Sequence, residues 1–343
     1  MSVARAVSLG TCLLVLLNAP AGATAATPAE FQNWFRAAAD GLLEIPGQVE
    51  HQARRFRYVF VGGFASERMT GYFSQSEKEL RAFGVPADAI ETIFPSSHEL
   101  YEGNSGEVRA RFLEIASKGP EPLVVIAHSR GACDALAFAL RDESFVRDRV
   151  HALFLVQGAF GGTGAADYLM GEGSLMDRRM PLRLRVLAYA LGRVERFLLG
   201  RGKHGGLPGL TLAESGRFWD RLTREHASAI PIVGPKTFYV TSEVNPARLR
   251  FFHRAIATYL QTYYGPNDGM VALRDQALPG LGTRLCVLDA AHTDLTHRFP
   301  ATRAPRRLRR ALIQSILMAV ADPSADPATA PPARVHRVHR RVR

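Results

Sequence analysis

Residues 124–132 read VVIAHSRGA, an apolar run that stops at a serine flanked by small residues. The run extends back to Pro122 as a continuous apolar strand, of the kind buried on both faces of a parallel sheet. The segment GACDALAFAL that follows has the pattern of a helix. A tight turn between strand and helix lifts its serine clear of the sheet, toward a ligand. The alternative is a structural turn in which Ser129 only caps the helix.

Strands and helices alternate along the rest of the chain. The sequence predicts strands at 56–64, 90–95, 122–129, 151–160, 236–242 and 283–290. It predicts helices at 27–45, 74–84, 105–119, 131–140 and 305–320, with Ser105 as the cap of the third helix. This alternation indicates an α/β fold with a mostly parallel sheet covered by helices on both faces. The alternation of strands and helices is interrupted between about 161 and 233. We interpret this segment as a helical lid or cap insertion above the sheet.

The two ends of the chain differ from its body. Residues 1–26 combine Arg5, the apolar run CLLVLLNAP and the small residues AGATAA, which is the pattern of a signal peptide. The apolar run is too short to span a membrane. Residues 322–343 are rich in Pro and Ala and then basic, which predicts a disordered tail. We therefore expect one domain at 27–321 in an exported protein, either periplasmic or secreted.

The composition limits the classes of partner. Hydrophobic residues make up 47% of the chain, enough for a large core, and the formal net charge is +11. A basic exported protein attracts envelope lipids or acidic polymers. The sequence contains no recognisable nucleic-acid-binding motif. The basic, leucine-rich segment 177–199 within the insertion is either a packed cap helix or a lid on an anionic lipid surface. The basic tail adds weak affinity for such a surface.

Two cysteines remain once the signal peptide is removed. Cys133 lies just after the serine turn and Cys286 lies in an apolar strand. We expect two buried free thiols, although an oxidising compartment leaves a pairing between them open. No cysteine or histidine cluster has the spacing of a zinc site.

A serine hydroxyl is a weak nucleophile unless an imidazole, itself oriented by an acid, removes its proton. In an α/β sheet with this turn the three groups follow in the order Ser, Asp, His. Asp268 lies in the loop sequence GPNDGMVAL, and His292 lies just beyond a strand in VLDAAHTDL. Glu243, directly after the strand 236–242, is the alternative acid. His128 points away from Ser129 by strand alternation, which predicts a packed or hydrogen-bonded histidine.

Five motifs, YVFVGGF, IAHSRGA, LFLVQGAFGGTGAADYL, PNDGMV and AAHTDL, together resemble the bacterial secreted triacylglycerol lipase/esterase family of the α/β-hydrolase fold. The resemblance runs from about Arg57 to Phe299. It implies a Ser129 nucleophile, a His292 base, an Asp268 acid and a mobile lid over an acyl pocket. Because the motif around Asp268 resembles the lipases, we prefer it to Glu243.

An oxyanion hole needs two backbone N–H groups aimed at the developing charge. The Arg130 N–H follows the nucleophile directly, and we assign the second donor to Phe64. These lipases usually carry His-Gly in that early loop, whereas this chain has Gly62-Gly63-Phe64. Ala127 likewise replaces the first glycine of the G-x-S-x-G motif.

The resemblance also raises the question of calcium. In calcium-binding relatives an aspartate two residues after the catalytic histidine helps to hold the ion, and Asp294 occupies that place. Arg298 stands where another ligand is expected, and Glu243 is the remaining candidate partner, although calcium needs several oxygen ligands. We expect no cofactor, with Asp294 as a weak calcium candidate.

These features predict an exported serine hydrolase that cleaves carboxylic esters of acyl lipids through an acyl-enzyme. The alternatives are a phospholipase, a polyester depolymerase or an acyltransferase on the same triad. A lipid-binding protein without activity on a hydrolase scaffold is a further alternative.

Overall fold

Six strands form one sheet in the part of the chain that the computed structural model describes, residues 26–170, 206–296 and 305–321. In sequence order they are β1 (Arg57–Val61), β2 (Ile90–Ile93), β3 (Leu123–His128), β4 (Val150–Val156), β5 (Thr237–Glu243) and β6 (Thr283–Asp289). The spatial order is β2-β1-β3-β4-β5-β6, and every neighbouring pair is parallel. The six predicted strands and the α/β fold are thus confirmed.

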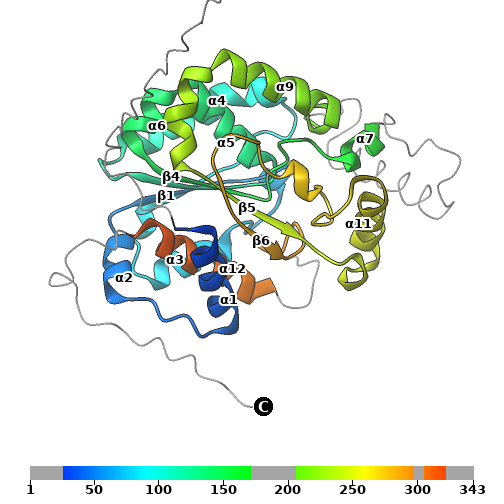
Figure 1. The fold of residues 1–343 in the computed structure, drawn as a ribbon. Coiled ribbons are helices and arrows are strands. Elements are labelled where there is room, and N and C mark those ends of the chain that lie inside the picture. The colour runs from blue at the N-terminus through cyan, green and yellow to red at the C-terminus, as the bar shows by residue number, and fades with distance from the viewer. Residues whose placement is uncertain (1–25, 171–205, 297–304, 322–343) are drawn as a thin grey trace, which may run out of the picture.

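Helices cover both faces of this sheet (Figure 1). One layer holds α4 (Tyr101–Ser117), α5 (Arg130–Arg141), α6 (Glu143–Arg149) and α9 (Leu212–Glu225). The other holds α1 (Pro28–Asp40), α2 (Gly47–Ala53), α3 (Ser74–Ala82) and α12 (Pro305–Val320). Successive side chains of a strand point to opposite faces of the sheet, so that Val125 packs in the first layer and Val124 in the second. The uniformly apolar runs in the sequence follow from this burial on both sides.

Two helix starts illustrate the local chemistry. Thr27 caps α1 in a capping box, because its backbone N–H donates to Glu30 Oε2 at 2.9 Å and its Oγ1 accepts from the Glu30 N–H at 3.3 Å. The prediction that Ser105 caps the third helix was wrong. That helix, α4, begins at Tyr101, and Ser105 Oγ donates to the Glu102 carbonyl at 2.7 Å from inside it.

The predicted insertion at 161–233 extends too far toward the C-terminus, because it includes α9. Phe218, Trp219 and Leu222 of α9 are buried in the core beside α5, so this helix belongs to a covering layer and not to a cap. α10 (Ile230–Val233) follows α9 after the 3-10 helix η5 (Ala227–Ala229), and α7 (Gly164–Met170) lies at the N-terminal end of the predicted insertion. The core of the predicted lid, including the basic segment 177–199, lies outside the described residues. So do residues 1–25 of the predicted signal peptide and the tail 322–343.

Cys133 and Cys286 are both buried and free, as expected. In the described ranges, no helix combines the length and the apolar character that crossing a bilayer requires.

Candidate active site

Ser129 occupies a strained turn between β3 and α5. Its backbone has φ 56° and ψ −129°, a conformation that non-glycine residues rarely adopt. The turn is tight because α5 approaches the loop after β1, and a Cβ added to Gly131 would lie only 2.2 Å from the Gly62 carbonyl oxygen. The Ser129 side chain makes no capping hydrogen bond to α5. The geometry therefore disfavours the structural-cap interpretation of this serine.

The structure brings Ser129, His292 and Asp268 together from three distant segments. His292 Nε2 lies 2.9 Å from Ser129 Oγ, and His292 Nδ1 lies 2.8 Å from Asp268 Oδ2. Asp268 is fully buried, while Ser129 and His292 each keep 9% of their surface exposed. A carboxylate on Nδ1 selects the tautomer in which Nε2 is free to accept a proton from the hydroxyl.

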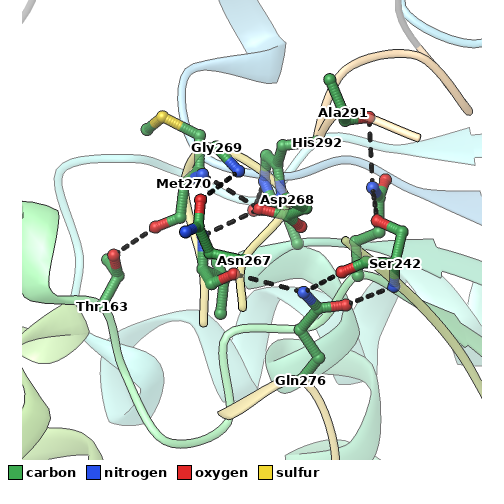
Figure 2. Close-up of polar contacts among 12 residues, drawn as sticks. Thr163, Ser242, Asn267, Asp268, Gly269, Met270, Gln276, Ala291 and His292 are labelled. Carbon is green, nitrogen blue, oxygen red and sulfur yellow. Dashed lines mark hydrogen bonds and ion pairs between the residues drawn. The ribbon is translucent and has the colours of Figure 1, made fainter. Parts of the chain in front are cut away.

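The acid loop between α11 (Phe251–Tyr264) and β6 holds the Asp268 carboxylate rigidly (Figure 2). Asp268 Oδ1 accepts from the backbone N–H groups of Met270 at 2.9 Å and Val271 at 2.8 Å. The side chain of Asn267 braces the same turn through the Gly269 N–H at 2.9 Å. One carboxylate oxygen is thus fixed by the backbone, and the other is left for the histidine.

Glu243, the alternative acid, does not reach this histidine. It is the exposed last residue of β5, and its backbone carbonyl accepts from the Ala290 N–H at 3.1 Å. Both ring nitrogens of His292 are already bonded to Asp268 and Ser129.

The two candidate oxyanion donors flank Ser129. A Cβ added to Gly63 would lie 2.9 Å from Ser129 Cβ, so the loop that carries Phe64 touches the serine. Arg130 is the first residue of α5, where an N–H has no partner inside the helix and the helix dipole favours negative charge. Among the described residues neither the Phe64 nor the Arg130 N–H donates to a backbone carbonyl.

Asp294, the calcium candidate, does not fit a cation site. It is fully buried, and its Oδ2 accepts from the Ala291 N–H at 3.1 Å. Burial lowers the pKa of Arg309 and of His253, and the Asp294 charge acts against burial at both. Arg309 stays charged, and its positive charge near this carboxylate opposes a calcium ion there. The described ranges contain no group of three or more metal-ligating side chains, and Arg298 lies outside them.

Several buried polar residues around the triad were missed by the sequence analysis. They surround the ends of β3, β4 and β5, and they are Tyr72, Gln157, Ser242 and Gln276. The available signal was a glutamine directly after the apolar run of β4. His128 was predicted to be packed or hydrogen-bonded, and it is buried with hydrogen bonds at both ring nitrogens.

Comparison with solved structures decides the fold type. A metagenomic carboxyl esterase superimposes with a TM-score of 0.57 at 19% identity, over 78% of this chain and 76% of its own. The mature lipase BlEst2 of Bacillus licheniformis gives a TM-score of 0.54 at 17% identity, over 78% of this chain and 93% of its own. The chain has the α/β-hydrolase fold. The resemblance to lipases and esterases is therefore confirmed for the α/β-hydrolase fold, and at such identities the likeness speaks for the fold alone.

Comparisons by sequence add nothing to this assignment. No known family profile matches the chain, and no curated protein does either.

Proposed function

We propose that the protein is a serine hydrolase of carboxylic esters, with Ser129 as nucleophile, His292 as general base and Asp268 as the acid that orients it. The observation that carries this proposal is the unbroken hydrogen-bonded series from Asp268 Oδ2 through the His292 ring to Ser129 Oγ, with contacts of 2.8 and 2.9 Å. Nucleophile and base within hydrogen-bond reach, with a third group behind the base, is the arrangement that nucleophilic catalysis requires.

The proposed reaction has two halves. His292 Nε2 takes the proton of Ser129 as Oγ attacks the acyl carbon, and the Phe64 and Arg130 N–H groups stabilise the oxyanion. The protonated imidazole then gives its proton to the departing alcohol, which leaves an acyl-enzyme. Water attacks that ester with His292 again as base. The bond between the acyl carbon and Ser129 Oγ then breaks, the imidazolium returns a proton to Oγ, and the carboxylic acid is released. Asp268 stabilises the imidazolium throughout and keeps its own charge.

An acyl lipid is the substrate class that we favour. Phe94 is 38% exposed, and a Cβ added to Gly62 would lie 2.8 Å from its ring. Met69 and Leu100 are also exposed apolar residues, on the loops after β1 and β2. Apolar side chains beside the oxyanion loop suit an acyl chain. Phospholipids, polyesters and acyl transfer to another alcohol share the same triad chemistry, because the triad does not select the acceptor.

Export and surface attachment complete the proposal. Residues 1–26 support a periplasmic or secreted location, and the basic segments 177–199 and 334–343 support contact with anionic lipid. We propose no metal or redox cofactor for the reaction.

The test compares Ser129→Ala with a matched control, Ser105→Ala, whose hydroxyl lies within α4. Wild type and Ser105→Ala should hydrolyse p-nitrophenyl acyl esters and react with a fluorophosphonate probe, whereas Ser129→Ala should do neither. Full hydrolysis by Ser129→Ala would refute the mechanism. An unlabelled, inactive wild type would instead support the non-catalytic lipid-binding alternative. A series of acyl lengths, with and without emulsified substrate, separates lipase from esterase.

A further inference from the structure

Gln157 has a strained backbone that the triad does not explain. Among the described residues three non-glycine residues have positive φ, namely Ala65, Ser129 and Gln157. They follow β1, β3 and β4, which are neighbours in the sheet. Ala65 lies in the loop of the oxyanion donor and Ser129 is the proposed nucleophile. Gln157, with φ 49°, belongs neither to the oxyanion loop nor to the triad. Backbone strain of this kind persists only where the surrounding structure holds it.

The side chain of Gln157 is fully buried behind the histidine loop. Its Nε2 donates to the Ala291 carbonyl at 3.2 Å and to Ser242 Oγ. Its Oε1 lies 3.2 Å from His128 Nε2. The Ala291 carbonyl can only accept, so it determines which end of the amide carries the N–H groups. The amide oxygen must therefore face His128.

The same reasoning determines the protonation of His128. Its Nε2 lies 2.8 Å from the His292 carbonyl oxygen, and two acceptors facing Nε2 require a proton there. Nδ1 is then an acceptor for the Tyr72 hydroxyl, which lies 2.6 Å away. Burial raises the pKa of Tyr72, so this hydroxyl keeps the proton that it donates.

These contacts hold the backbone of His292 on both sides of its Cα. The His292 N–H donates to the Asp268 carbonyl at 2.8 Å. The His292 carbonyl accepts from His128, and the preceding carbonyl, of Ala291, accepts from Gln157. A residue with three such backbone contacts presents its ring in one place, and reacting groups lose rate steeply when displaced by about 1 Å.

The network continues from Ser242, which Gln157 contacts, through Gln276 to the acid loop (Figure 2). Gln276 Oε1 accepts from the Ser242 N–H at 2.8 Å, and Gln276 Nε2 donates to the Val271 carbonyl at 3.2 Å. The Val271 N–H in turn donates to Asp268 Oδ1 at 2.8 Å. A continuous set of hydrogen bonds thus joins the segments that carry the three triad residues.

We propose that Gln157 is a positioning residue, whose side-chain amide links His128 and Ala291 and so holds the His292 ring in hydrogen-bond reach of Ser129. This inference rests on the proposed esterase function, since it concerns the geometry of that triad. Gln157 touches neither substrate nor the reacting atoms in this scheme. It acts through the backbone of His292.

Gln157→Met tests the proposal, because methionine nearly matches glutamine in shape and lacks its amide. We expect kcat on a p-nitrophenyl ester to fall about 10- to 100-fold, with KM unchanged and with an equal fall in the rate of fluorophosphonate labelling. The matched control is Gln52→Met, which removes another buried glutamine, in α2, and should leave kcat at the wild-type value. Circular dichroism and the unfolding midpoint establish that both variants are folded.

A second pair of variants keeps the test valid if Gln157→Met does not fold. His128→Leu removes the donor to the His292 carbonyl, whereas His128→Gln keeps an N–H near the position of Nε2. We expect His128→Gln to recover much of the kcat that His128→Leu loses. Wild-type kcat in Gln157→Met, or equal losses in the two His128 variants, overturns the positioning role alone. A wild type that neither hydrolyses esters nor labels at Ser129 overturns the proposed function first, and this inference with it.

Discussion

Asp268 and His292 are joined by two hydrogen bonds, one between side chains and one between backbones. The carboxylate Oδ2 lies 2.8 Å from Nδ1, and the Asp268 carbonyl accepts from the His292 N–H, also at 2.8 Å. The backbone hydrogen bond fixes the position of the His292 backbone relative to Asp268. The proposed acid and base therefore keep their relative position independently of any substrate.

Asp268→Asn should inactivate the enzyme while preserving the fold. The backbone N–H groups of Met270 and Val271 keep the amide oxygen at the position of Oδ1, which turns the NH2 group toward His292 Nδ1. Nδ1 must then accept, so the ring proton moves to Nε2 and Ser129 loses its base. We expect kcat to fall about 10⁴-fold, measured on a p-nitrophenyl ester beside an unfolding curve.

Glu243→Gln is the control for the choice of acid. Its carboxylate is exposed at the end of β5, so the substitution should leave kcat at the wild-type value. A large loss in this variant, with activity retained in Asp268→Asn, would reverse the assignment.

Gly131→Ala should destabilise the fold and lower activity. The added Cβ would lie 2.2 Å from the Gly62 carbonyl oxygen and 2.7 Å from that of Val61, both of them backbone atoms. Overpacking of this kind costs about 1–3 kcal/mol of unfolding free energy. Urea unfolding and the esterase assay measure the two effects.

Gly106→Ala should stabilise the fold, in contrast to Gly131→Ala. Gly106 lies inside α4, and an added Cβ meets no heavy atom within 4 Å. Replacing a helical glycine by alanine there should raise the unfolding free energy by about 1 kcal/mol. A stability change of the same sign in both variants would contradict the close approach of α5 to the β1 loop.

Asp134 should make the stability depend on pH. Burial raises the pKa of this carboxyl to about 6 from an ordinary value of 3.8, and nearby Arg130 opposes the shift. The folded state therefore binds the proton more tightly, so its contribution to stability is complete below about pH 4 and is lost as the pH rises through 6. The loss amounts to roughly 3 kcal/mol.

The comparison of wild type with Asp134→Asn isolates this contribution. Urea unfolding at several pH values between 4 and 8 should show wild type losing stability relative to the variant over that window. A constant difference across the range would mean that Asp134 titrates normally in the folded protein.

The two cysteines of the folded domain should resist alkylation. Burial raises the pKa of the Cys133 thiol to about 12 and also that of Cys286, and the thiolate is the reactive form. Peptide mapping after N-ethylmaleimide treatment should find both residues unmodified in the native protein and modified in urea. Recovery of a cystine-linked peptide would contradict the free thiols.

The sequence predicted the features that depend on local pattern. All six strands could be predicted, because most are short apolar runs between polar loops; β2, with the sequence IETI, is the least apolar of them. The segments of Ser129 and His292 could also be predicted, because each residue lies in a loop directly after a strand. Asp268 was preferred to Glu243 because the motif around it resembles the lipases.

Features that depend on distant contacts escaped prediction. α9 looked like part of an insertion because its sequence does not reveal that Phe218 and Trp219 face α5. Gln157 lies in the motif LFLVQGAFGGTGAADYL, which gave it no role, and Gln276 lies in none of the five motifs. Their partners lie far away along the chain, as with Ala291 for Gln157. Ser105 resembles a cap, although the packing of the Tyr101 ring on Phe218, with centroids 4.7 Å apart, favours an earlier helix start.

The contact between Gly131 and the Gly62 backbone limits how this protein can acquire new substrates. The start of α5 packs against the end of β1. The Phe64 and Arg130 N–H groups, the two proposed oxyanion donors, therefore cannot move apart to accept a bulkier group at the reacting carbonyl. Laboratory selection for other esters should therefore leave 61–64 and 129–131 unaltered, and should collect its substitutions in the walls that contact the acyl and alcohol portions.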